Sequence, residues 1–184
     1  MINAVEIPMY TCSTSPMGML EELFAEDPWK LLLSTILLNR TRRIQVDGCI
    51  HAFLEKWSSP EEVIHAEVDE ISSVIAPLGM HHRRAKGLSR FCKDYLQLLK
   101  SKRPKENGIS RALNSKDDAD ADPSRHLTRN EILQLYDCGS FAADAYEIFV
   151  RRNWSGVNPS DHALRAFVNW KRGAEAEMLQ PIAK

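Results

Sequence analysis

The sequence contains 184 residues, of which 43% are hydrophobic, 27% charged and 8% aromatic. This length fits one domain or a tight pair of sub-domains, and the composition excludes a wholly disordered or fibrous chain. The formal net charge is −1. It is unevenly distributed, because residues 81–105 contain nine basic residues and one acidic residue, a net charge of +8. This basic block indicates either an anion-binding face or a solvated helix followed by a basic linker.

Cysteine spacing and hydropathy exclude several other classes of protein. The four cysteines are too far apart for a zinc ribbon or a four-cysteine iron–sulfur loop, so we expect buried thiols in a reducing compartment and no metal. The longest apolar run, Leu31–Leu38, is much shorter than the ~20 residues that span a bilayer. The first residues contain no basic segment typical of a secretory signal. We therefore expect no membrane association.

Helix-start signals recur along the chain, whereas clear strand signals do not. Three of them combine a capping residue with proline, and the fourth is a capping box. They are Ser15-Pro16, Asp27-Pro28, Ser59-Pro60 and Thr128 to Glu131. The second precedes an apolar segment that we expect to form a central helix running on to Thr41, surrounded by other helices. Helical periodicity continues through Ile44–Trp57, Leu88–Leu99 and Tyr146–Val150, so the predicted fold class is all-α.

One polar segment interrupts this helical pattern. Residues 101–125 begin basic, turn acidic and contain few apolar side chains. We expect a flexible insertion at about 101–126 that separates a helical body from a C-terminal helical part of the same domain.

Two glycine-containing turns between predicted helices are candidate phosphate-binding sites. They are Pro77–Met80, which precedes the basic block, and Leu135–Gly139. A helix that starts after such a turn directs its backbone N–H groups and its dipole towards an anion. A helix C-cap without a ligand has the same sequence pattern.

Two further features have open interpretations at this point. Asp161, in the stretch Val157–His162, follows a proline near a predicted helix start, where an N-cap aspartate is the simpler explanation. The stretch Leu38–Arg43 ends an apolar helix with three arginines, which suits phosphate contact or insertion into a nucleic-acid groove but also a solvated helix end.

Four stretches of the chain, by their residues and their order, resemble one family. The stretches are D-P-W-K-L-L-L-S-T-I-L-L-N-R-T, P-L-G-M-H-H-R-R-A-K, L-Y-D-C-G-S-F-A-A-D-A-Y-E-I-F and W-S-G-V-N-P-S-D-H-A-L. Together they resemble the helix–hairpin–helix (HhH-GPD) DNA glycosylases related to endonuclease III. Within that superfamily, they are most similar to the mismatch-specific thymine/uracil glycosylase domain of methyl-CpG-binding-domain repair proteins. The resemblance runs from about Ser15 to Trp170 without the insertion, and implies two helical sub-domains with a DNA-binding cleft between them.

The resemblance also implies roles for single residues. Asp161 takes the place of the catalytic carboxylate, which stabilises the oxocarbenium-like sugar and positions the attacking water. Phe141 occupies the position of the Schiff-base lysine of bifunctional members, so no AP-lyase activity is expected. Arg40, beside Asn39, corresponds to the arginine that fills the space left by the flipped base, and Met80 corresponds to the wedge beside the widowed guanine.

The remaining implied contacts are with the DNA backbone. Arg84 and Lys86 match positions expected to meet phosphate, and Cys138 and Gly139 belong to the hairpin. Asp137 replaces a glycine that usually faces the phosphate in this family, and its charge would repel DNA.

The function implied is a monofunctional DNA glycosylase. It would flip thymine, uracil or a damaged pyrimidine paired with guanine out of double-stranded DNA and hydrolyse its N-glycosidic bond. We expect a monomer without cofactor, nuclear in a eukaryote and cytoplasmic otherwise. One alternative is a catalytically weakened DNA-binding module of the same fold, which the residues Asp137 and Phe141 suggest. The other is a helical protein–protein scaffold with a solvated basic face and no concave pocket.

Overall fold

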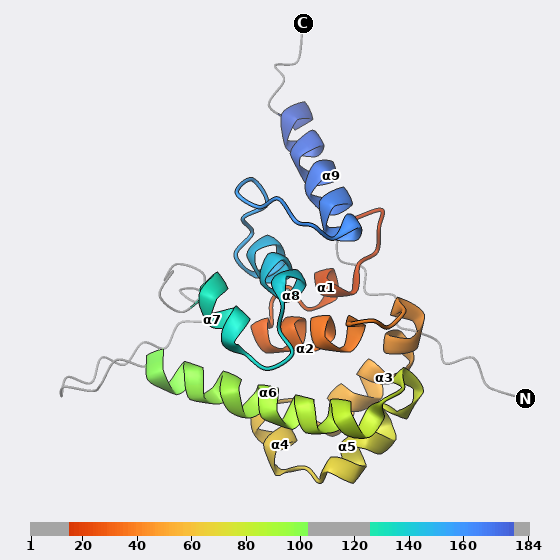
Figure 1. Cartoon of the computed structure of the whole chain (residues 1–184). Coiled ribbons are helices and arrows are strands. Elements are labelled where there is room, and N and C mark those ends of the chain that lie inside the picture. Colours follow the sequence, from red (N-terminus) through yellow and green to blue (C-terminus); the bar gives the residue numbers. More distant parts are fainter. Residues whose placement is uncertain (1–14, 103–125, 179–184) are drawn as a thin grey trace, which may run out of the picture.

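The computed structural model describes residues 15–102 and 126–178, and every regular element in these ranges is helical (Figure 1). This confirms the all-α prediction. The elements are α1 (Leu20–Leu23), α2 (Pro28–Leu38), α3 (Arg43–Lys56), α4 (Pro60–His65), α5 (Val68–Val74), the 3₁₀ turn η1 (Ala76–Leu78), α6 (His81–Lys102), α7 (Arg129–Gln134), α8 (Ser140–Ala145), the π-helical turn η4 (Tyr146–Val150) and α9 (His162–Met178).

Three of the four predicted helix starts are confirmed by their hydrogen bonds. The Asp27 carboxylate accepts from the backbone N–H of Lys30, at 3.1 Å, at the start of α2. The Ser59 hydroxyl accepts from the N–H of the third residue of α4, and Thr128 forms the expected capping box with Glu131 in α7. These starts were predictable because each cap depends on residues within four positions of one another.

The fourth predicted start, Ser15-Pro16, is wrong. The chain makes a turn there, in which Gly18 adopts φ +55°, and helix α1 begins only at Leu20. The carboxylate of Glu22 accepts hydrogen bonds from the backbone N–H groups of Ser15 and Met19, at 2.6 and 2.8 Å, and from the Ser15 hydroxyl. Glu22 therefore closes this turn on itself, and the left-handed glycine prevents a helix from running through it.

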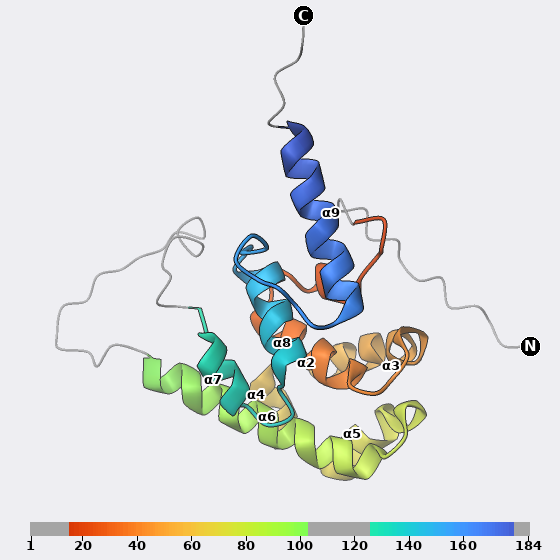
Figure 2. The ribbon, with the colours of Figure 1, turned by 45° about the horizontal axis from the view of Figure 1, so that its top comes forward.

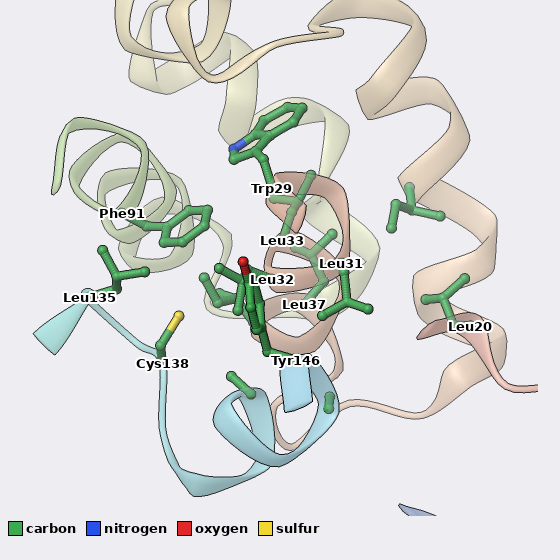
Figure 3. Packing of buried hydrophobic residues seen from close by; sticks show 14 of the residues in the cluster. Leu20, Trp29, Leu31, Leu32, Leu33, Leu37, Phe91, Leu135, Cys138 and Tyr146 are labelled. Atoms are coloured by element: carbon green, nitrogen blue, oxygen red, sulfur yellow. The ribbon is translucent and has the colours of Figure 1, made fainter. Parts of the chain in front are cut away.

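Helix α2 is the centre of the fold, as predicted. All residues from Leu31 to Leu37 are buried, and the helix contacts α1, α3, α8 and η4. Figure 3 shows Phe91 of α6 and Tyr146 of η4 directed towards the leucines of α2. The helix ends at Leu38 rather than at Thr41, because the following residues form a turn.

Helix α6 crosses the lower part of the molecule in Figure 1, above α4 and α5. It packs against α4 and α5 on one side, and the connection between α7 and α8 lies against it on another (Figures 1 and 2). The helix includes Ser101 and Lys102, the first two residues of the predicted insertion, so the prediction is wrong for these two, and residues 103–125 lie outside the described residues. Lys102 donates to the carbonyl of His126 at 2.9 Å and pairs with Glu131 at 2.8 Å, so the two ends of this segment lie together.

Candidate active site

A pocket of about 480 Å³ opens between the end of α2, the α7–α8 hairpin and the start of α9. Pockets that bind small molecules have volumes of roughly 300–1,000 Å³, so one nucleobase with its sugar fits. Five of the nine predicted site residues line it, namely Asn39, Arg40, Gly139, Phe141 and Asp161. The other lining residues are Thr35, Leu38, Asp137, Ser140, Ala142 and Ser160. The sequence did not mark Thr35 of the apolar helix α2, and it marked Leu38 only as the start of the stretch Leu38–Arg43.

Asp161 is held firmly in this pocket. Its Oδ1 accepts hydrogen bonds from the backbone N–H groups of Ala163, at 2.9 Å, and Leu164, at 3.0 Å, at the start of α9. Its Oδ2 lies 3.9 Å from Nδ1 of His162, and the side chain is 32% exposed. The simple N-cap interpretation of Asp161 is therefore correct, and the same residue also faces a pocket. Helix α9 fixes the direction of the carboxylate.

The turn before Asp161 is fixed by the helix that follows it. The Arg165 guanidinium donates to the carbonyls of Pro159, at 3.2 Å, and Ser160, at 3.0 Å. About two turns further along α9, the Arg172 guanidinium donates to the carbonyls of Trp154, Ser155 and Val157. Two arginines thus hold the loop that delivers the carboxylate.

A second carboxyl group, that of Glu21, lies within electrostatic reach of Asp161. Burial raises the pKa of Glu21 above its ordinary value, and the negative charge of Asp161 raises it further, while Arg43 partly opposes both effects. The Glu21 side chain is only 3% exposed. Glu21 is not among the site residues predicted from the sequence, since burial of a glutamate cannot be read from its neighbours.

The turn Asn39–Thr41 carries the predicted finger residue Arg40 at the pocket mouth. Arg40 is exposed and adopts a left-handed conformation, with φ +57°. Arg84 of α6 reaches across to this turn. It donates to the carbonyls of Leu37, at 3.4 Å, and Asn39, at 2.9 Å, and to the Thr41 hydroxyl, at 2.8 Å. Its guanidinium therefore lies against the protein, and its expected contact with phosphate stays a prediction.

The hairpin between α7 and α8 places Asp137 and Gly139 in the pocket and Cys138 in the core. Asp137 lines the pocket in a left-handed conformation, with φ +58°. Cys138 is buried and points its sulfur inwards (Figure 3), and burial raises its thiol pKa to about 12. Its backbone N–H donates to the carbonyl of Leu135 at 3.2 Å. Cys138 is thus a packing residue, whereas Gly139 and Phe141 line the pocket.

The predicted wedge residue lies outside the pocket. Met80 is 64% exposed, has φ +48° and precedes α6 directly. An apolar side chain on a strained, exposed turn is a candidate for contact with a ligand. Along the same helix, Arg83, Lys86 and Arg90 are exposed to solvent.

A family comparison accounts for this arrangement of hairpin, pocket and carboxylate. Residues 33–173 match the model of the HhH-GPD superfamily of base excision DNA repair proteins. The chain belongs to this family. The matched region of the HhH-GPD chain begins inside α2 and ends inside α9, so it includes the Asn39–Thr41 turn, the hairpin and Asp161.

Two of three similar relatives carry glycosylase names. The chain is 30% identical over 158 residues to a methyl-CpG-binding domain protein 4-like protein of Arabidopsis thaliana, covering 86% of this chain and 29% of the relative. It is 33% identical over 89 residues to a thymine/uracil-DNA glycosylase of Pyrobaculum aerophilum, covering 48% of this chain and 39% of the relative. It is 37% identical over 67 residues to a thymine-DNA glycosylase of Aeropyrum pernix, covering 36% and 30%. The HhH-GPD chain therefore spans less than half the length of each.

A solved structure shares the HhH-GPD fold. The structure of a thermostable thymine-DNA glycosylase superposes with a TM-score of 0.52 at 21% identity, covering 68% of this chain and 48% of that chain. In the described part of this HhH-GPD chain, no group of three or more His, Cys, Asp or Glu side chains is arranged to hold a metal ion. None of the described helices has the length and apolarity needed to cross a bilayer.

Proposed function

We propose that this chain is the catalytic domain of a monofunctional DNA glycosylase acting on thymine or uracil paired with guanine in double-stranded DNA. The observation that carries the proposal is the position of Asp161, whose carboxylate is fixed by α9 and faces a pocket of nucleotide size. The names of the relatives support the choice of pyrimidine. Such an enzyme flips the target base out of the duplex, at lower cost where the base is mispaired.

In this mechanism the carboxylate acts on the sugar. As the bond from C1′ to the base nitrogen breaks, its electron pair leaves with the base and positive charge develops on the sugar, which the Asp161 carboxylate stabilises. A water oxygen then bonds to C1′ and transfers a proton to the carboxylate or to solvent, and the departing base takes a proton from solvent. The products are a free base and an abasic site.

The side chain at position 141 supports hydrolysis rather than lyase chemistry. A lyase needs an amine that attacks C1′ to form a Schiff base. Phe141 lines the pocket and carries no nucleophile, and none of the described residues that line the pocket is a lysine. Its ring instead offers a stacking surface for a flipped base.

The remaining predicted contacts concern the duplex itself. In the proposal, Arg40 fills the space left by the flipped base, Met80 wedges the opposite strand, and Lys86 meets phosphate. All three side chains are exposed, as such contacts require. We further propose that the chain acts as a monomer and, in a eukaryote, in the nucleus.

The test is incubation of the protein with duplexes containing G·T, G·U and A·U pairs, followed by alkali cleavage. Strand breaks at G·T or G·U that appear only after alkali are expected. Excision from the A·U duplex at an equal rate would contradict the mismatch preference, and no cleavage of any duplex would contradict the glycosylase assignment.

A catalytically weakened DNA-binding module is the second candidate, favoured by one observation. Asp137 lines the same pocket as Asp161, and its negative charge opposes phosphate at the hairpin. This candidate predicts a measurable affinity for mismatched duplexes without release of base. The scaffold alternative predicts no concave pocket, so the pocket beside Asp161 counts against it.

A further inference from the structure

Arg84 joins the two exposed turns that the proposed function assigns to the duplex. Its guanidinium donates to the carbonyls of Leu37 and Asn39 and to the Thr41 hydroxyl, across more than 40 residues of sequence. Its backbone N–H donates to the carbonyl of Met80 at 3.0 Å, in the first turn of α6. One residue therefore contacts the turn that carries Arg40 and the turn that carries Met80.

The Asn39–Thr41 turn requires such support. The last carbonyl groups of a helix have no partners within the helix, and a non-glycine residue in the left-handed region costs free energy. Helix α2 ends at Leu38, and Arg40 adopts φ +57° two residues later. A guanidinium offers five donors in a fixed planar fork, so one side chain can satisfy several acceptors of the turn at once.

We propose that Arg84 is the positioning residue of the Asn39–Thr41 turn, and that it sets the orientation of Arg40 relative to Met80. The role of Arg40 in this inference rests on the proposed function. The effect of Arg84 on the conformation of the turn does not. The proposal assigns Arg84 to the protein side of the interface, and leaves phosphate contact to Lys86, the exposed cation two positions later on α6.

The first measurement reports on the turn without DNA or activity. Hydrogen exchange of the peptide covering residues 37–42 should become faster in Arg84→Ala, and should be unchanged in Lys93→Ala, which removes an exposed cation from the same helix. In Arg84→Lys the exchange should be intermediate, because an ammonium cannot reproduce the planar fork. Unchanged exchange in Arg84→Ala would overturn the proposal, whatever the activity of the protein.

The second measurement is a double-mutant cycle with Arg40. Binding is compared between a matched duplex and one with a stable abasic analogue opposite guanine, for Arg84→Ala, Arg40→Ala and the double variant. If Arg84 acts through Arg40, both single variants lose the preference for the abasic duplex, and the double variant loses no more than Arg40→Ala alone. Additive losses would overturn the proposal.

Activity and salt dependence complete the test. Single-turnover excision by Arg84→Ala should fall by up to about 100-fold, as for a displaced catalytic group, and should approach the rate of Arg40→Ala. The slope of log K against log salt on matched duplex should stay as in the wild type for Arg84→Ala, but decrease by ~0.9 for Lys86→Ala. A slope change in Arg84→Ala would make it a phosphate contact instead. A wild type that prefers the abasic duplex but excises no base would contradict the enzyme and not the positioning.

Discussion

Gly87 of α6 lies directly beneath Tyr136 of the hairpin. A Cβ atom at position 87 would come within 3.0 Å of both Tyr136 Cε1 and Asp137 Oδ2. The Arg90 guanidinium also contacts the Tyr136 ring and lies 4.7 Å from the ring centroid. The absence of a side chain at position 87 therefore lets Tyr136 and Asp137 of the hairpin pack closely against α6.

Gly87→Ala should lower the free energy of unfolding by about 1–3 kcal/mol through overpacking, despite the gain of roughly 1 kcal/mol in helix propensity. The matched control is Gly48→Ala in α3, where nothing lies within 4 Å of an added Cβ. That variant should be more stable by about 0.5–1 kcal/mol. Urea unfolding of both variants measures the difference. If Gly87→Ala stabilises the protein as much as Gly48→Ala does, the hairpin can move to accommodate the added methyl group without cost.

Asp161→Asn should lower the single-turnover excision rate by ~10³-fold or more, because the stabilising charge is lost. The asparagine oxygen can still accept from the N–H groups of Ala163 and Leu164, so the fold and DNA binding should be retained. Asp161→Ala removes the cap as well and should cost about 1 kcal/mol of stability in addition. An Asp161→Asn protein that excises at the wild-type rate would end the assignment of Asp161.

Borohydride should trap no covalent complex between the wild-type protein and DNA, since Phe141 carries no amine. Phe141→Lys should form a trapped complex with a duplex containing an abasic site, because position 141 lines the same pocket as Asp161. Phe141→Leu is the control without an amine. Trapping by the unmodified protein would contradict the monofunctional assignment.

Asp137→Gly should bind duplex DNA about five- to tenfold more tightly, the effect of removing one screened negative charge near phosphate. Glycine also accepts the left-handed backbone at this position, φ +58°. Asp137→Asn separates the two effects, because asparagine tolerates this conformation but carries no charge. If both variants bind more weakly than the wild type in a fluorescence titration, Asp137 does not face DNA.

Glu21 should make stability decrease as pH rises. Burial raises the pKa of Glu21 above the value of 4.5 that it has in an exposed chain. The folded state therefore holds the proton more tightly than the unfolded state does, and the resulting stabilisation is complete below pH 4.5 and is lost as pH rises through the folded pKa. Glu21→Gln should remove this loss, so its stability relative to the wild type should grow between pH 4 and 8. A difference in the free energy of unfolding between Glu21→Gln and the wild type that stays constant across this range would contradict the raised pKa of Glu21.

The helices that sequence patterns predicted correctly are those whose signals are local. Asp27, Ser59 and Thr128 cap their helices with hydrogen bonds to residues within four positions. The end of α2 was missed because the turn at Asn39–Thr41 contacts Arg84, which is more than 40 residues away in sequence, and no local signal marks it. The turn at Ser15 was missed because Glu22 folds back onto it.

In the candidate site, too, some features were predictable from the sequence and others depend on packing between distant elements. The family resemblance found Asp161, Arg40 and Phe141, which the structure brings to one pocket. It assigned Arg84 to phosphate, and it did not indicate the hydrogen bonds of this guanidinium with the end of α2. Burial of Glu21 and the inward direction of Cys138 follow from packing between elements, which a motif does not encode.

Lys102 contacts His126 and Glu131, so the fold can accept a change in the number of residues between positions 102 and 126. The end of α6 and the start of the next described segment are joined by a single ammonium group, at 2.9 and 2.8 Å. The entropic cost of closing a loop grows only slowly with its length. Residues can therefore be added or removed between these two ends while the pocket, which is built from α2, the hairpin and α9, keeps its shape.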